Sequence, residues 1–424
     1  MGAADADPTR TPREGSSGDA RGRPPLARGP RARWVVLGML LLGAIALLTG
    51  IGLREPPAPP PEPGPFYDAP RPLPEGSAGT VVRARAIEDP PAGARAFRLL
   101  YLSRAHDGER AALSALLFVP RRPASEGRRD IVAFTHGTLG VARRCAVSFD
   151  RTMWSHVAGL RRFLAAGNAV VVPDFEGLGT RGTPPYLAGI PQAWATLDAV
   201  RAAAAFRPAE ANLRFIAVGV GTGGQAALFA GQLAPRYAPE LELAGVAAAA
   251  PAGDLRELLE RTRSTTFGRV VSAYTLTTWR DVYDLPVDEI VAREGRPALR
   301  GLADTCVRAD DARLGSDVAE LARGLRYARA NPWDRPPWRR LLERNSPGRR
   351  AIAVPVLLAQ GSADRLVTPA ATRALARRLC ATGTRVELRA VGRARHADIA
   401  RRSSGAVTRW VGDRFAGRSA GTSC

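Results

Sequence analysis

Apolar runs and amphipathic stretches alternate along the chain from about residue 66 onward. Short apolar runs bounded by turn residues predict buried strands, whereas longer stretches with apolar residues at helical spacing predict helices. The expected strands are 97–102, 111–119, 128–135, 169–173, 213–219, 243–250, 354–360 and 386–391, and the expected helices include 153–166, 193–205 and 369–379. Strands that alternate with helices predict an α/β fold, in which a mostly parallel sheet carries helices on both faces.

One stretch, residues 253–346, interrupts this alternation between two expected strands. Its pattern is helical and charged, and it is rich in aromatic residues: Trp279, Tyr283, Tyr327, Trp333 and Trp338. We expect a helical cap inserted over the functional site. A plain helical excursion with a solvated charged face is the alternative.

The N-terminal part has its own layout, and it divides the 424 residues into four segments. Residues 1–33 are polar and rich in Arg, Gly, Pro and Ser, which predicts a disordered tail. Residues 34–53 carry no charge and are long enough to cross a bilayer as a membrane anchor. Residues 54–65 form a proline-rich linker, and residues 66–424 form the α/β domain.

The arginines before the apolar stretch predict a cytoplasmic tail and a C-terminal domain outside the cytoplasm. A signal peptide that is cleaved to release a secreted protein is the alternative. The uncleaved anchor is favoured because the apolar stretch is longer than a usual signal-peptide core and no A-x-A-like cleavage site follows it.

The charge of the chain does not indicate a nucleic-acid partner. The formal net charge is +21, and all 61 basic residues are arginine. They are scattered rather than gathered on one stripe, and aromatic residues make up only 6% of the chain. Nucleic-acid binding is therefore disfavoured, and a weak attraction to anionic membrane surfaces fits the charge better.

A glycine turn in the middle of the chain is the most informative motif. Residues 219–224 read Gly-Val-Gly-Thr-Gly-Gly, directly after an expected strand and before a helix-like stretch. A strand, a tight glycine turn and a helix are the setting of the G-x-S-x-G nucleophile elbow of α/β-hydrolases. Gly219 and Gly223 match the outer glycines of that motif, and Gly221 stands where the motif has serine.

The same turn also spells G-x-G-x-x-G, the dinucleotide-binding fingerprint. That fingerprint requires an acidic residue about 20 positions further on, at the end of the next strand. Here Asp254 follows the next expected strand but lies 30 residues beyond Gly224. A dinucleotide-binding protein is therefore the less favoured alternative.

Two residues near the C-terminus complete a possible catalytic group. Asp364 follows the expected strand 354–360, and His396 follows the expected strand 386–391. The order of elbow, Asp and His is that of α/β-hydrolases. In this interpretation Asp364 orients His396, which acts as general base. A turn-capping Asp364 and an ordinary surface-loop His396 are the alternatives.

A second loop predicts the oxyanion hole, the backbone donors that stabilise a reacting carbonyl. Residues 136–140 read His-Gly-Thr-Leu-Gly after the expected strand 128–135, which resembles the H-G-x-x-G loop of esterases. We expect the backbone N–H groups of Thr138 and Thr222 to be the donors. In this motif His136 is structural, followed by Gly137.

Four cysteines, Cys145, Cys306, Cys380 and Cys424, all lie beyond the predicted anchor. An even number in an oxidising compartment predicts disulfides, and three pairings are possible. One of them, Cys145–Cys306 with Cys380–Cys424, would tie the cap to the core and the tail to the last layer. Four free, mostly buried thiols are the alternative. No Cys/His cluster indicates a metal, and no cofactor is expected.

Several stretches together resemble the secretory lipase family, which includes the Candida-type lipases and bacterial relatives. They are residues 66–67 (Phe-Tyr), 135–140 (Thr-His-Gly-Thr-Leu-Gly), 144–148 (Arg-Cys-Ala-Val-Ser), 173–179 (Pro-Asp-Phe-Glu-Gly-Leu-Gly) and 230–245 (Ala-Gly-Gln-Leu-Ala-Pro-Arg-Tyr-Ala-Pro-Glu-Leu-Glu-Leu-Ala-Gly). The resemblance covers residues 66–415. It implies an α/β-hydrolase fold with a helical cap, secretion, and hydrolysis of acyl esters such as triacylglycerols.

The resemblance also implies roles for single residues. It assigns the triad acid to Asp364, the base to His396 and the nucleophile position to Gly221, where the family has serine. It supports the pairing of Cys145 with Cys306, and of the other two cysteines with each other.

Glycine cannot act as a nucleophile, so the chain departs from the family at the reacting atom. Thr222 as a substitute nucleophile, or water activated directly by His396, would give slow turnover. Two functions follow: a membrane-anchored esterase with impaired catalysis, or a pseudoenzyme that binds an acyl ester, a lipid or a partner protein.

Overall fold

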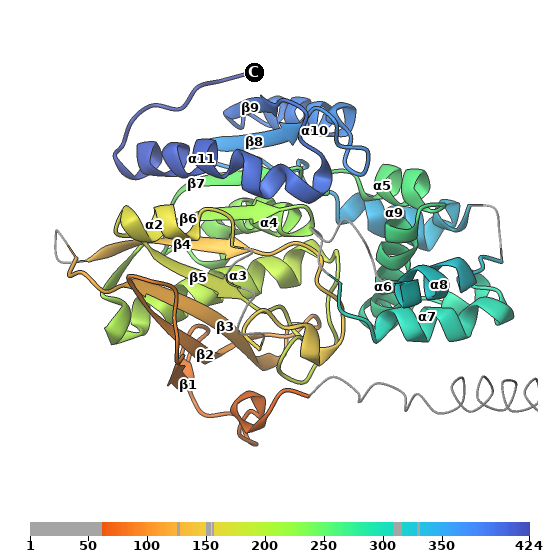
Figure 1. The fold of residues 1–424 in the computed structure, drawn as a ribbon, viewed down its shortest axis with the longest axis horizontal. Coiled ribbons are helices and arrows are strands. Elements are labelled where there is room, and N and C mark those ends of the chain that lie inside the picture. The colour runs from red at the N-terminus through yellow and green to blue at the C-terminus, as the bar shows by residue number, and fades with distance from the viewer. Residues whose placement is uncertain (1–61, 125–127, 150–153, 155–156, 308–315, 329–330) are drawn as a thin grey trace, which may run out of the picture. The chain divides into compact units, whose positions relative to one another are not determined.

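The computed structural model describes residues 62–124, 128–149, 154, 157–307, 316–328 and 331–424. Within them a nine-stranded sheet has the order β1-β2-β3-β5-β4-β6-β7-β8-β9 (Figure 1). The strands are β1 (Val81–Ala86), β2 (Ala94–Arg104), β3 (Arg110–Pro120), β4 (Arg129–Thr135), β5 (Ala169–Pro173), β6 (Ala211–Val220), β7 (Glu242–Ala249), β8 (Val356–Gly361) and β9 (Val386–Val391).

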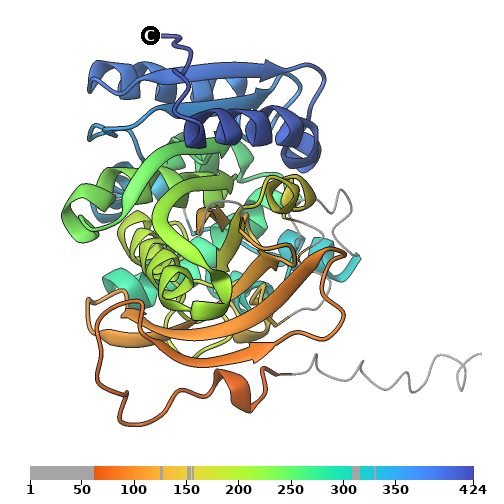
Figure 2. The ribbon, with the colours of Figure 1, turned by 90° about the vertical axis from the view of Figure 1, so that its left-hand side faces the viewer.

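The sheet is antiparallel at one end and parallel over the rest. Strands β1, β2, β3 and β5 pair antiparallel, whereas β5, β4, β6, β7, β8 and β9 pair parallel. Figure 2 shows the orange strands β1–β3 and the blue strands β8 and β9 at opposite ends of the sheet. The predicted α/β fold with a mostly parallel sheet is confirmed.

Helices cover both faces of this sheet. They are α2 (Leu160–Ala165), α3 (Gly189–Ala205), α4 (Thr222–Tyr237), α10 (Pro369–Ala381) and α11 (His396–Phe415). Apolar residues of α3, α4 and α10 share one buried core, while α2 and α11 contribute to a second core. Because both faces are buried, the parallel strands are continuous apolar runs rather than alternating ones.

The segment between β7 and β8 forms a separate group of helices. They are α5 (Leu255–Thr262), α6 (Thr266–Tyr283), α7 (Arg296–Ala303), α8 (Ser316–Gly324) and α9 (Pro336–Arg344). Figure 1 shows these helices gathered on one side of the sheet. Trp279, Trp333 and Trp338 are fully buried among them, so the aromatic residues of this segment make its own apolar core.

Two disulfides join distant parts of the described chain. Cys145 bonds Cys306, and Cys380 bonds Cys424. The favoured pairing is therefore confirmed, and four free thiols are excluded. The first bond ties the loop after β4 to the segment after α7, and the second ties the C-terminus to α10.

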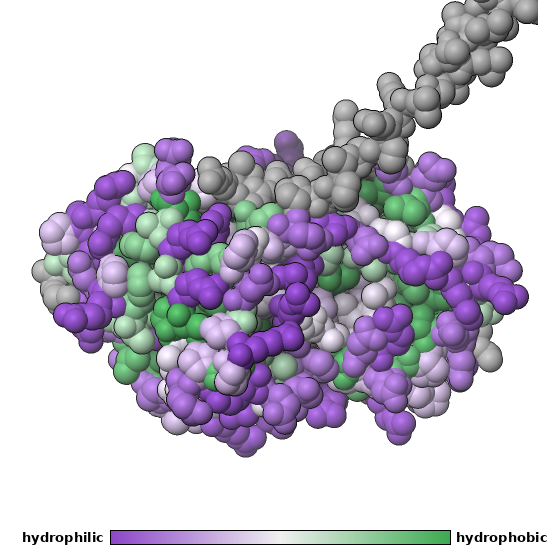
Figure 3. Space-filling view, turned by 90° about the horizontal axis from the view of Figure 1, so that it is seen from below, coloured by the Kyte–Doolittle hydropathy of each residue, from purple (hydrophilic) through white to green (hydrophobic). Residues whose placement is uncertain are grey.

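The predicted membrane anchor, residues 34–53, lies outside the described residues, as do the tail 1–33 and most of the linker 54–65. Among the helices that the structure describes, none combines the length and the apolar character that a bilayer span requires. Figure 3 shows one face of the described part, on which hydrophilic side chains predominate and apolar ones form small separate areas.

Candidate active site

The carboxyl ends of β8 and β9 bring an acid and a base together. Asp364 lies in the turn after β8, and His396 is the first residue of α11, just beyond β9. His396 Nδ1 lies 2.9 Å from Asp364 Oδ2. The side chain of Asp364 is fully buried and that of His396 is 14% exposed, so the pair is largely shielded from water.

The backbone of the following turn fixes the carboxylate. Asp364 Oδ1 accepts hydrogen bonds from the N–H groups of Leu366 (2.9 Å) and Val367 (3.0 Å). Its other oxygen therefore serves His396, whose Nδ1–H donates to it. With Nδ1 as the donor, the neutral ring presents Nε2 as a proton acceptor.

The glycine turn after β6 faces that nitrogen. Gly221 has φ +57° and ψ −117°, and its N–H donates to Ala249 O at 3.0 Å. Its carbonyl accepts from the N–H of Ala252, also at 3.0 Å. A Cβ atom added to Gly221 would lie 3.3 Å from His396 Nε2. A side chain at this position would therefore project toward the base.

The outer glycines of the turn are under a different constraint. A Cβ on Gly219 would lie 2.2 Å from Gly223 O, and one on Gly223 would lie 2.1 Å from Thr135 O. Both contacts are with backbone, which cannot give way cheaply. The fold therefore requires glycine at 219 and 223 for space, whereas at 221 only the positive φ favours it.

The loop after β4 supplies the second side of the site. Thr138 Oγ1 lies 2.7 Å from Tyr186 Oη and 3.5 Å from Thr222 Oγ1. Thr222 is the first residue of α4, so its N–H has no acceptor within the helix. Among the described residues, neither Thr138 nor Thr222 donates its backbone N–H to a backbone carbonyl.

His136 belongs to this loop but not to the acid–base pair. It is buried, and its Nδ1 donates to Gly137 O at 2.8 Å. Burial lowers the pKa of His136 to about 4, so the ring is neutral at physiological pH.

These groups line one small apolar cavity of about 60 Å³. Gly137, Thr138, Gly221, Thr222 and His396 form its polar end. The remaining wall is apolar, and its members are Val220, Ala252, Leu258, Phe267, Val271, Leu366, Val367, Ala397 and Ala400. Part of this wall comes from α5 and α6, so the helical segment closes over the site.

Sequence reasoning missed Tyr186 and the cavity-lining residues Leu258, Phe267 and Val271. Leu258 on α5, and Phe267 and Val271 on α6, are visible in the sequence as apolar residues. No local sequence pattern shows which face of these helices contacts the site.

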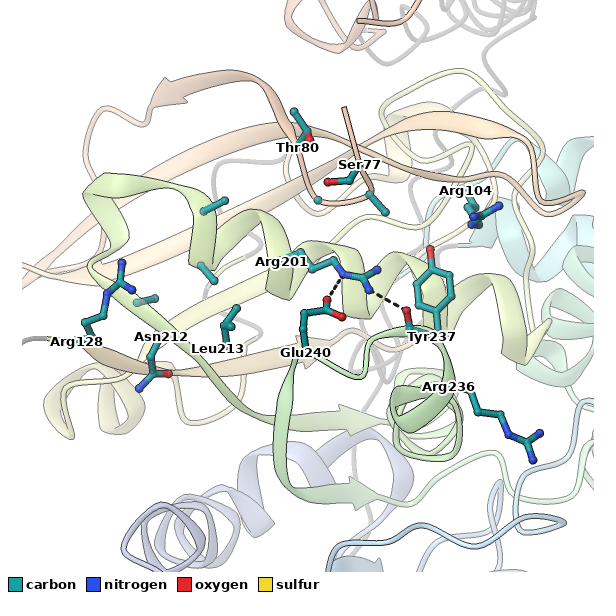
Figure 4. A pocket seen from close by; sticks show the side chains of 15 residues that line it. Ser77, Thr80, Arg104, Arg128, Arg201, Asn212, Leu213, Arg236, Tyr237 and Glu240 are labelled. Atoms are coloured by element: carbon teal, nitrogen blue, oxygen red, sulfur yellow. Dashed lines mark hydrogen bonds and ion pairs between the residues drawn. The ribbon is translucent and has the colours of Figure 1, made fainter. Parts of the chain in front are cut away.

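A larger cavity, of about 880 Å³, lies elsewhere (Figure 4). It is lined by the start of β6, roughly 30 Å along that strand from Gly221. Arg104, Arg128 and Arg236 surround it, and Arg201 is held by Glu240 and the Tyr237 carbonyl. It has no histidine and no acid–base pair, so it lacks the chemistry of the smaller cavity. Among the described residues no group of His, Cys, Asp and Glu could hold a metal ion.

The sequence profile described as "Secretory lipase" matches residues 153–423. The chain belongs to the secretory lipase family.

Two relatives of this secretory lipase family member match most of its sequence. A probable inactive lipase of Mycobacterium tuberculosis is 26% identical over 380 residues, covering 84% of this chain and 83% of the relative. A secreted triacylglycerol lipase of Malassezia globosa is 25% identical, covering 86% and 83%.

Two solved structures have a similar fold. Candida antarctica lipase A has a TM-score of 0.71 at 19% identity, covering 87% of this chain and 89% of that lipase. The rice cell wall degrading esterase LipA from Xanthomonas oryzae has a TM-score of 0.64 at 18% identity, covering 80% and 98%.

Proposed function

We propose that this chain is an acyl-ester hydrolase scaffold that lacks its nucleophile, because Gly221 stands at the serine position of the secretory lipases. The observation that carries the proposal is the 3.3 Å between a Cβ built on Gly221 and His396 Nε2. Asp364 orients the histidine, and the N–H groups of Thr138 and Thr222 form the oxyanion hole.

The missing side chain makes efficient turnover implausible. Removing the nucleophile of a serine hydrolase costs about a million-fold in rate, and the remaining groups retain roughly a thousand-fold over water. Thr222 is a poor substitute because its hydroxyl faces Thr138, at 3.5 Å. The pocket therefore serves to bind an acyl compound rather than to cleave it. The similarity to a protein named as a probable inactive lipase supports this view.

We also propose that the protein is anchored by residues 34–53, with the domain 66–424 outside the cytoplasm and helices 253–346 as its cap. The secretory family and the two disulfides support an extracytoplasmic site. Secretion after cleavage of the N-terminal segment is the other outcome. Cell fractionation of the full chain distinguishes them, because an anchored protein stays in the membrane fraction after a high-salt wash.

The catalytic part of the proposal is tested by restoring the serine. Hydrolysis of p-nitrophenyl butyrate and p-nitrophenyl palmitate is measured for the full chain, for Gly221→Ser and for Gly221→Ala as the matched control. We expect near-background rates for the parent and for Gly221→Ala, and a rise of about a thousand-fold or more for Gly221→Ser. A folded Gly221→Ser variant without any gain would contradict the proposal.

A further inference from the structure

The Nε2 atom of His396 is accessible to a ligand from the cavity. Asp364 holds His396 by Nδ1, and among the described residues no group hydrogen-bonds to His396 Nε2. Around a Cβ built on Gly221, the atoms within 4 Å are Nε2 (3.3 Å) and Cε1 (3.7 Å) of His396, apart from the chain neighbours of Gly221. A ligand atom can therefore reach the histidine where a side chain would otherwise stand.

The polar groups at this end of the cavity are suited to an anion. The first backbone N–H groups of α4, including that of Thr222, carry the positive end of the helix dipole. Thr138 adds a further backbone N–H, and a protonated His396 adds a charged donor. No acidic side chain lines the cavity among the described residues, because Asp364 contacts His396 Nδ1, on the other side of the ring from Nε2.

The rest of the cavity is suited to a hydrocarbon chain. Leu258, Phe267 and Val271 from the cap face Leu366 and Val367 from the loop after β8. A ligand that satisfies both ends has one carboxylate and one alkyl chain.

We propose that the pocket binds a free fatty acid in preference to its ester, with one carboxylate oxygen on His396 Nε2–H and the other on the N–H groups of Thr138 and Thr222. This inference rests on the proposed function, because it assigns the ligand of the same site. An ester has no charge to pair with the imidazolium, and hydrogen bonds to charged groups are about twice as strong as neutral ones. Without a side chain at Gly221, the acid gains a contact that the ester does not.

The proton balance is simple. In the proposed complex His396 carries a proton on each ring nitrogen, one donated to Asp364 and the other to the ligand carboxylate. No covalent bond forms or breaks. Any proton taken up on binding of the acid therefore depends on His396.

The experiment is calorimetric titration of the full chain with octanoate and with methyl octanoate, in two buffers of different ionisation enthalpy. We expect octanoate to bind the parent at least about tenfold more tightly than methyl octanoate. In His396→Ala the preference for octanoate narrows and any dependence on the buffer disappears. In Gly221→Ala, where a methyl group blocks the approach to Nε2, the preference for the acid narrows.

Three results would overturn the inference: equal binding of acid and ester by the parent, no binding of either, or an undiminished preference for the acid in His396→Ala. The last result would assign the carboxylate to surface arginines. Hydrolysis of p-nitrophenyl octanoate by Gly221→Ser separates this inference from the proposed function. Hydrolysis without acid preference in the parent refutes only the fatty-acid site, whereas acid preference without hydrolysis refutes only the missing-nucleophile proposal.

Discussion

His396 of the Asp364–His396 pair lines the same cavity as the Gly221 turn. The pair is held together by a side-chain hydrogen bond, whereas the turn is held by backbone contacts alone. The pair depends on one hydrogen bond of 2.9 Å and on the two backbone donors that hold Asp364. The turn depends on close backbone packing at Gly219 and Gly223. The packing of the turn therefore does not depend on a side chain at position 221.

The Gly221 turn and the Asp364–His396 pair also differ in backbone strain. An L-residue at φ +57° costs about 1–3 kcal/mol, which an active enzyme accepts at its nucleophile. Glycine at 221 adopts this φ without that cost. The acid–base pair has no such relief, because a buried carboxylate without its partner is destabilising.

The largest effect is expected when His396 or Asp364 is substituted in the Gly221→Ser variant. In a Gly221→Ser background, His396→Ala should lower kcat by about a million-fold, or to the parent's rate if that is reached first. Asp364→Asn should lower it by about ten thousand-fold, because the ring then adopts the wrong tautomer. Steady-state hydrolysis of p-nitrophenyl butyrate measures both. Full activity in either double variant would show that a different base serves the site.

A single methyl group at Gly223 is expected to disrupt the glycine turn after β6. Gly223→Ala places Cβ 2.1 Å from Thr135 O and should destabilise the fold by more than about 4 kcal/mol. Gly221→Ala is the matched control and should cost only about 1–3 kcal/mol, from its positive φ. Urea unfolding followed by circular dichroism gives both values. Similar costs at the two positions would contradict the distinction between them.

A second buried carboxylate sharpens the contrast with Asp364. Asp174 is paired with hydroxyl groups, those of Ser114 (2.6 Å) and Ser148, rather than with a histidine. Burial raises its pKa to about 6. The folded state therefore binds the extra proton between about pH 4 and pH 6, and the stabilisation is present below pH 4 and lost as the pH rises through 6.

Over that range the parent should lose about 3 kcal/mol relative to Asp174→Asn, at about 1.4 kcal/mol per pKa unit. Urea unfolding of both proteins at pH 4, 5, 6 and 7 gives the difference. Parallel stability curves for the two proteins would show that Asp174 is ionised in the folded state throughout.

Much of the sheet could be predicted because its central strands are buried on both faces. The expected bounds of β5 and β9 are those observed, and β4 differs by one residue. Strand β1 was missed because Val81–Ala86 lies at the sheet edge and carries arginines at alternate positions, so that it has no apolar run. The edge position alone does not hide a strand, because β9 lies at the other edge of the sheet and has its expected bounds.

Part of the candidate site could likewise be predicted from the sequence, and part could not. Asp364 and His396 could be predicted from the order of strands, since parallel strands bring their carboxyl ends to one edge. The contact of Tyr186 with Thr138 and the cavity wall from Phe267 and Val271 could not. These depend on how the cap packs on the sheet, which no local spacing encodes.

The central claim, that only the nucleophile is missing, is tested most directly by covalent labelling. The full-length parent and Gly221→Ser are treated with a fluorophosphonate, which reacts with serines activated by a histidine, and the modified peptide is identified by mass spectrometry. The account predicts stoichiometric labelling of the introduced serine, no labelling of the parent, and loss of labelling in Gly221→Ser/His396→Ala. An unlabelled but folded Gly221→Ser variant, or a parent labelled at Thr222, would contradict it.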